Sequence, residues 1–180
     1  MKTASPTILM VDDDPDFLFL AERAFRKNGV VNNIQTTVNG SEAIAYMMGE
    51  GRFADRTAFP YPTFIITDLK MPVGDGFAVL EHLKSNPAWA VIPVVVLTGS
   101  SDKDDIKKAY MLGASAFHVK PTAVGGLQHQ LKVLHDYWMT CEVPQVDSTG
   151  RQLPTNSKGK LGERFDQPDG GGGPTRLVDQ

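Results

Sequence analysis

Apolar and polar residues along the chain form two kinds of segment, short apolar runs and longer amphipathic stretches. The short runs are rich in β-branched residues, and this composition and their brevity favour strands over helices. The strong strand candidates are residues 7–11, 63–67 and 92–97, and the weaker ones are residues 33–38 and 115–119.

Helical periodicity lies between these runs. Pro15 can open the first helix, because its missing N–H would have no partner in the first turn. Asn28-Gly29 is a signal for the end of that helix. The other predicted helices span residues 40–48, 76–85, 102–112 and 123–140. Strand and helix therefore alternate five times, which predicts an α/β fold with a doubly wound, five-stranded parallel sheet and five helices.

The composition changes at about Cys141. Prolines and glycines recur from there on, Gly170–Gly173 is an unbroken glycine run, and apolar residues are sparse. Such a segment cannot bury enough apolar surface to offset the entropy lost on ordering. We therefore expect one domain over residues 5–140 and a disordered C-terminal tail over residues 141–180.

Composition and charge exclude several classes of protein. The chain has 180 residues, of which 41% are hydrophobic, enough for one domain with a full core. The net charge of −3 argues against a nucleic-acid partner. No apolar run approaches the roughly 20 residues that span a membrane. The N-terminus lacks the features of a signal peptide, and the single cysteine suits a reducing compartment, so we expect a cytoplasmic location.

Polar residues stand where four of the predicted strands end. Each alone is ordinary, because Asp often occupies turns and Thr often ends strands. The carboxyl ends of parallel strands meet at one edge of a sheet, however, so these residues are expected to converge there. They are Asp12, Asp13 and Asp14 after the first strand, Asp68 after the third, Thr98 after the fourth and Lys120 after the fifth.

This set of residue types fits phosphoryl transfer. Carboxylates with few other ligands suit Mg²⁺, which prefers oxygen ligands and keeps several waters. A carboxylate can itself be a nucleophile and form an aspartyl phosphate. A lysine and a hydroxyl can then hold the remaining phosphoryl oxygens. The sequence therefore predicts a divalent-cation site after the first strand that brings a phosphoryl group to Asp68.

Four motifs in order carry a resemblance to a known family. They are Asp12-Asp13, DLKMPVGDGF (68–77), VLTGS (96–100) and FHVKP (117–121). Together they resemble the receiver domain of two-component response regulators, over roughly residues 5–140. The resemblance implies a flavodoxin-like sheet with strand order 2-1-3-4-5. It also implies a signalling module, not an enzyme, that accepts phosphate from a histidine kinase.

The resemblance assigns roles to the acids and their neighbours. Asp68 would be the phospho-acceptor. Asp13 would bind Mg²⁺ directly, Asp12 would assist largely through water, and the backbone carbonyl of Lys70 would be a further ligand. The positive side chain of Lys70, two residues after the acceptor, is expected to tune the lifetime of the phosphoryl group. We interpret Asp14 as part of the start of the first helix.

The resemblance also assigns the residues that respond to phosphate. Thr98 would bind the phosphoryl group and shift on activation, and Lys120 would pair with its oxygens. Phe117 matches the aromatic switch position. In the family the bond that corresponds to Lys120-Pro121 is typically cis, and proline is the residue before which cis bonds do occur.

The output is expected to be a binding event or a phosphorelay step, because the tail is too short and polar for a DNA-binding module. The connection 49–62 and the stretch HDYWM (135–139) resemble small regulators partnered with bacterial phytochrome-type histidine kinases. A homodimer face is expected on the fourth helix, fifth strand and fifth helix. Tyr110, Phe117 and Trp138 would be its aromatic anchors, although simple packing of the helix end explains Tyr137 and Trp138 equally well.

Three other classes of protein share some of these sequence features. A haloacid-dehalogenase-like aspartyl-phosphate hydrolase places its acids as DxD, which Asp12-x-Asp14 satisfies, but it leaves Asp68 unexplained. A flavin carrier is excluded, because three carboxylates after the first strand would repel the flavin phosphate. A receiver-fold binding module that never uses phosphate stays open.

Overall fold

Five parallel strands form one sheet with the order β2-β1-β3-β4-β5 in the computed structural model, which describes residues 6–144, 146–147 and 149–152. The strands are β1 (Thr7–Val11), β2 (Asn33–Thr37), β3 (Phe64–Thr67), β4 (Val94–Thr98) and β5 (Ala116–Val119). The predicted fold class and strand order are confirmed.

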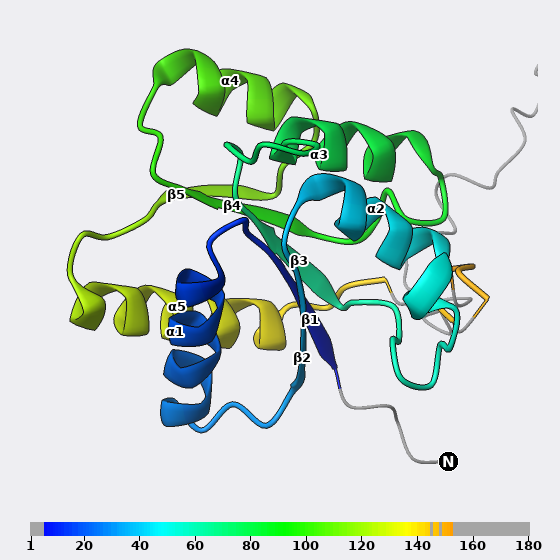
Figure 1. The fold of residues 1–180 in the computed structure, drawn as a ribbon, viewed down its shortest axis with the longest axis horizontal. Coiled ribbons are helices and arrows are strands. Elements are labelled where there is room, and N and C mark those ends of the chain that lie inside the picture. The colour runs from blue at the N-terminus through cyan, green and yellow to red at the C-terminus, as the bar shows by residue number, and fades with distance from the viewer. Residues whose placement is uncertain (1–5, 145, 148, 153–180) are drawn as a thin grey trace, which may run out of the picture.

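Helices cover both faces of this sheet (Figure 1). They are α1 (Pro15–Lys27), α2 (Gly40–Met48), α3 (Gly76–Ser85), α4 (Lys103–Met111) and α5 (Val124–Thr140), with a 3-10 helix, η1 (Gly51–Phe53), after α2. Helices α1 and α5 lie together on one face, and α2, α3 and α4 lie on the other. Among the described residues, no helix is both long and apolar enough to cross a membrane.

The position of each strand explains the strength of its sequence pattern. Strands β1, β3 and β4 lie inside the sheet, and all of their residues are buried. A strand that is covered on both faces has a continuous apolar sequence. Strands β2 and β5 are the two edges of the sheet, and most of their residues are only half-buried. Their sequences are therefore less apolar, and they gave only weak strand predictions.

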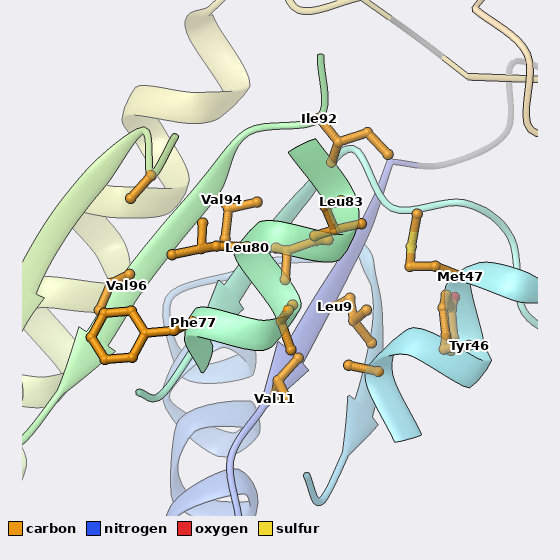
Figure 2. Packing of buried hydrophobic residues seen from close by; sticks show 14 of the residues in the cluster. Leu9, Val11, Tyr46, Met47, Phe77, Leu80, Leu83, Ile92, Val94 and Val96 are labelled. Atoms are coloured by element: carbon orange, nitrogen blue, oxygen red, sulfur yellow. The ribbon is translucent and has the colours of Figure 1, made fainter. Parts of the chain in front are cut away.

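The core consists of two layers separated by the sheet. Successive side chains of a strand point to opposite faces, so Leu9 and Val11 face α2 and α3, whereas Ile8 and Met10 face α1 and α5. Figure 2 shows the first layer, where Leu80 of α3 packs between strand and helix side chains. Its labelled members are Leu9, Val11, Tyr46, Met47, Phe77, Leu80, Leu83, Ile92, Val94 and Val96.

Aspartates begin three of the helices. The Asp14 side chain accepts hydrogen bonds from the backbone N–H groups of Asp16 (2.9 Å) and Phe17 (3.1 Å), so it caps α1. Asp75 caps α3 and Asp102 caps α4 in the same way. The interpretation of Asp14 as a helix-start residue is confirmed, because its carboxylate accepts the hydrogen bonds of the first turn of α1.

Part of the predicted disordered tail packs against the domain. The described residues of 146–152, which we name the C-terminal turn, form an antiparallel bridge between Val146 and Gln152. Gln152 Nε2 donates to the Pro87 carbonyl at 2.8 Å, and Val146 packs against the first core layer. In Figure 1 this orange segment lies beside the loop that leads into β3. Residues 153–180, the rest of the predicted tail, lie outside the described residues.

Candidate functional site

Three carboxylates meet at the carboxyl end of the sheet. Asp12 and Asp68 follow β1 and β3, which are hydrogen-bonded neighbours, and Asp13 comes next to Asp12. One oxygen of each lies within 4.8 Å of the others. Asp12 and Asp68 are buried, whereas Asp13 is exposed. The structure therefore brings together three of the four acids that the sequence placed at this edge, two of them largely out of water.

Lys120 joins the two buried carboxylates. Its Nζ lies 2.6 Å from Asp12 Oδ2 and 2.7 Å from Asp68 Oδ2. The ring of Phe17 lies 4.0 Å from the same nitrogen and offers it a cation–π contact. The lysine comes from the end of β5, two strands away from β3, and only its long side chain allows this reach.

Burial and charge act against each other in this cluster. Burial raises the pKa of the Asp12 carboxyl above its ordinary value, and the hydrogen bond and charge of Lys120 oppose that rise only in part. Burial alone would lower the pKa of Lys120, but the hydrogen bonds and charges of Asp12 and Asp68 leave it raised. The ammonium therefore stays charged, and it compensates the carboxylates that it touches.

The backbone after β3 fixes the second carboxylate. Asp68 Oδ1 accepts hydrogen bonds from the N–H groups of Leu69 (2.6 Å) and Lys70 (3.3 Å), while Oδ2 bonds to Lys120. Gly76 closes the loop, since a Cβ at that position would lie 2.1 Å from the Asp68 carbonyl oxygen. This role of Gly76 was not predicted from the sequence, where the only signal is a glycine at the start of a predicted helix.

Thr98 and Lys70 lie on two loops that flank the acids. Thr98 is fully buried at the end of β4, and its Oγ1 lies 3.4 Å from the backbone N–H of Ser100. The Lys70 side chain points to α4, where its Nζ pairs with Asp105 Oδ2 at 2.8 Å. Ser100 Oγ donates to the same oxygen at 2.6 Å. Hydrogen bonds from Lys70 and Ser100 hold the pKa of Asp105 below its ordinary value.

Ser100 and Asp105 are site residues that the sequence pattern does not reveal. In the structure, Asp105 at the start of α4 contacts both loops. A pairing between residues 35 positions apart leaves no periodic signal, so spacing alone could not have found it.

Two of the three predicted aromatic anchors, Phe117 and Trp138, are half-buried and pack against the core. Phe117 on β5 is half-buried and packs against the first core layer. Trp138 stacks on Phe64 with ring centroids 6.3 Å apart and packs against the second layer. The packing explanation therefore accounts for Trp138, whereas Tyr137 and Tyr110 are well exposed.

The expectation of a cis Lys120-Pro121 bond is wrong for this structure, because no described peptide bond is cis. The physical reason lies in proline itself. The two isomers before a proline differ by only about 0.5–1 kcal/mol, so a resemblance in sequence does not determine which one the chain adopts.

The residues present fit a divalent cation. Three carboxylate groups with an oxygen each inside a 4.8 Å cluster are the hard oxygen ligands that Mg²⁺ and Mn²⁺ take. Asp14 is turned away to cap α1, so the Asp12-x-Asp14 pair required by the hydrolase alternative does not form a metal site.

Comparisons with known proteins agree with this geometry. The family model of the response regulator receiver domain matches residues 8–132. A probable methanogenesis regulatory protein, FilR2 of Methanothrix harundinacea, is 30% identical over 73% of this chain and 83% of its own. The response regulator Rcp1 of Synechocystis is 28% identical over 73% of this chain and 88% of its own.

Two solved structures are similar in fold and sequence. The phosphorylated cyanobacterial phytochrome response regulator RcpA has a TM-score of 0.73 and 31% identity, over 79% of this chain and all of that chain. The Mn²⁺-bound form of Rcp1 has a TM-score of 0.71 and 28% identity, over 78% of this chain and 99% of that chain. With the matched family model and the acidic cluster, these findings lead to one conclusion: the chain belongs to the response regulator receiver domain family.

Proposed function

We propose that this chain is a response regulator that accepts a phosphoryl group on Asp68 from a phosphohistidine of a kinase. The observation that carries the proposal is the cluster of Asp12, Asp13 and Asp68 with Lys120 bonded to two of them. Two backbone N–H groups orient the buried carboxylate of Asp68 beside an ammonium, an arrangement that suits attack on a phosphoryl group.

Mg²⁺ is the proposed cofactor, held by Asp12, Asp13, Asp68 and the backbone carbonyl of Lys70. When bound, it would neutralise negative charge on the carboxylates and on the incoming phosphoryl oxygens. The similar protein Rcp1 has been solved in a Mn²⁺-bound form, and the same ligand chemistry serves either ion.

In the proposed transfer, an Asp68 carboxylate oxygen forms a bond to phosphorus while the phosphorus–nitrogen bond to the kinase histidine breaks, and the imidazole leaves. Lys120 Nζ lies beside Asp68 Oδ2 and would follow the new phosphoryl oxygens. The Thr98 hydroxyl is buried at the neighbouring strand end and would donate to another of them. The phosphoryl group later leaves by hydrolysis, in which water attacks phosphorus and the Asp68 carboxylate is released.

A change of partner binding is the proposed output. Thr98 and the half-buried ring of Phe117 on the adjacent edge strand would shift together and favour a second arrangement of α4 and β5. The face formed by α4, β5 and α5 carries exposed Tyr110, Val119 and Tyr137. It is the proposed surface for a second copy or an output protein.

A histidine kinase is the proposed phosphoryl donor. RcpA is a cyanobacterial phytochrome response regulator, and a second similar protein, 27% identical, is a response regulator in red-light signalling of R. palustris. These two proteins support a phytochrome-type kinase as the partner of this chain.

The test is incubation of the wild-type protein with Mg²⁺ and acetyl phosphate, followed by intact mass measurement. We expect a gain of one phosphoryl group that disappears with EDTA and in Asp68→Asn. The control is Asp14→Asn, which removes a neighbouring carboxylate outside the cluster and should still gain phosphate.

A gain that persists in Asp68→Asn would contradict the assignment of the acceptor. If the wild type gains no phosphate and also fails to bind beryllofluoride, the remaining alternative, a receiver-fold module that works without phosphate, takes precedence.

A further inference from the structure

Lys70 contacts two carboxylates, one through its backbone and one through its side chain. Its backbone N–H donates to Asp68 Oδ1 at 3.3 Å, so the residue starts next to the acceptor carboxylate. Its Nζ nevertheless pairs with Asp105 Oδ2 at 2.8 Å. A lysine has a flexible four-carbon stem, so the same ammonium can be redirected without movement of the backbone.

A hydrogen bond from Ser100 orients the Asp105 carboxylate for its contact with Lys70. The Ser100 hydroxyl donates to Asp105 Oδ2 at 2.6 Å and accepts from the backbone N–H of Asp102, the residue that caps α4. The Ser100 N–H in turn lies 3.4 Å from Thr98 Oγ1. The pair thus connects the loop after β3, which carries Lys70, to the loop after β4 and the start of α4.

We propose that Asp105 is a positioning residue that holds the Lys70 ammonium away from Asp68 and releases it to a phosphoryl group there. This inference rests on the proposed function and adds a means of regulation to it. A phosphoryl group brings about −2 charge beside the Lys70 backbone, and it competes with the single charge of Asp105. The release also removes one tie between the two loops, so charge at Asp68 is coupled to the position of α4.

The exposure of the pair sets the size of the effect. The Lys70 side chain is 62% exposed and the Asp105 side chain is 16% exposed. Partly exposed ion pairs shift equilibria modestly and are weakened by salt. Removal of the Asp105 charge should therefore strengthen anion binding at Asp68 by about two- to fivefold at low salt, and by less at high salt.

The experiment is a double-mutant cycle with beryllofluoride and Mg²⁺ as the probe, measured by titration calorimetry. Asp105→Asn should bind beryllofluoride two- to fivefold more tightly than the wild type, and the same substitution in a Lys70→Ala background should change nothing. The matched control is Asp104→Asn, which removes an exposed carboxylate from the same helical turn and should leave the affinity unchanged.

Results that contradict the role of Asp105 can be distinguished from a result that contradicts the proposed function. Equal affinity of Asp105→Asn and the wild type overturns the proposal, and so does an increase that persists without the Lys70 side chain. An equal increase in Asp104→Asn would assign the effect to general helix charge and also overturn it. In all three cases the wild type still binds the probe, so the proposed function stands. Failure of the wild type itself to bind beryllofluoride overturns both.

Discussion

A half-buried lysine lies at each end of the sheet, and the pKa values of the two lysines shift in opposite directions. At the carboxyl end, Lys120 lies between Asp12 and Asp68, and their charges leave its pKa raised. At the amino end, Lys84 donates to the carbonyl oxygens of Ala90 and Ile92, each at 2.8 Å. Burial lowers the pKa of Lys84, with no carboxylate charge to oppose it.

This difference distinguishes the candidate functional site at the carboxyl end from the purely structural packing at the amino end. The carboxyl end collects net negative charge that a cation must balance, which is the condition for binding a metal ion and a phosphoryl group. At the amino end, Lys84 donates hydrogen bonds to nearby backbone carbonyls, and aromatic rings pack together. There the rings of Tyr61 and Trp89 pack against each other, and Gly150 of the C-terminal turn packs against both. Changes at the first end should alter chemistry as well as stability, and changes at the second should alter stability alone.

The largest effect is expected from Lys120→Met. This substitution leaves two buried carboxylates without their cation, and loss of one partner of a buried pair should lower the free energy of unfolding by about 3 kcal/mol. Mg²⁺ should stabilise this variant more than the wild type, because the ion then supplies the missing positive charge. Urea unfolding with EDTA and with Mg²⁺ measures both quantities.

The control for Lys120→Met is Lys84→Met at the other end of the sheet. It should leave phosphoryl gain from acetyl phosphate intact and show no extra response to Mg²⁺. A Mg²⁺ response as large in Lys84→Met as in Lys120→Met would remove the distinction between the two ends.

A smaller effect is expected from Gly150→Ala in the C-terminal turn. Gly150 has φ of +79°, and a Cβ there would lie 2.7 Å from Tyr61 Oη and 3.3 Å from Trp89 Nε1. The left-handed conformation and the lost docking together should cost about 2 kcal/mol. The Trp89 emission should also change, measured in a Trp138→Phe background so that one tryptophan remains.

Gly29→Ala is the matched control, because Gly29 has φ of +78° and no atom within 4 Å of the added Cβ. It should cost only about 1 kcal/mol and leave the Trp89 emission unchanged. If Gly150→Ala behaves like Gly29→Ala in both measurements, the C-terminal turn does not contribute to the packing at this end.

The smallest effect is a difference in pH dependence between the two lysines. A folded-state pKa below the ordinary 10.5 means that the unfolded chain binds more protons at Lys84, so that lysine should add stability as pH rises toward 10.5. A raised folded-state pKa means that the stability from Lys120 is present below 10.5 and is lost only above it.

Unfolding of the wild type, Lys84→Met and Lys120→Met between pH 7 and pH 10 checks these signs. The stability difference between the wild type and Lys84→Met should move in favour of the wild type by less than about 1 kcal/mol. The difference between the wild type and Lys120→Met should stay level over the same range. Parallel slopes would show that the lysines do not differ as described.

The sequence by itself determined the fold class, the strand order through the family resemblance, and the meeting of Asp12, Asp13, Asp68, Thr98 and Lys120 at one sheet edge. It could do so because buried parallel strands read as apolar runs and their ends fall at fixed points of the chain. The tertiary structure alone decided which atoms pair across those ends: Lys120 with Asp12, Lys70 with Asp105, and the C-terminal turn with Tyr61 and Trp89. Such contacts join residues far apart in sequence through flexible side chains, and neither periodicity nor composition records them.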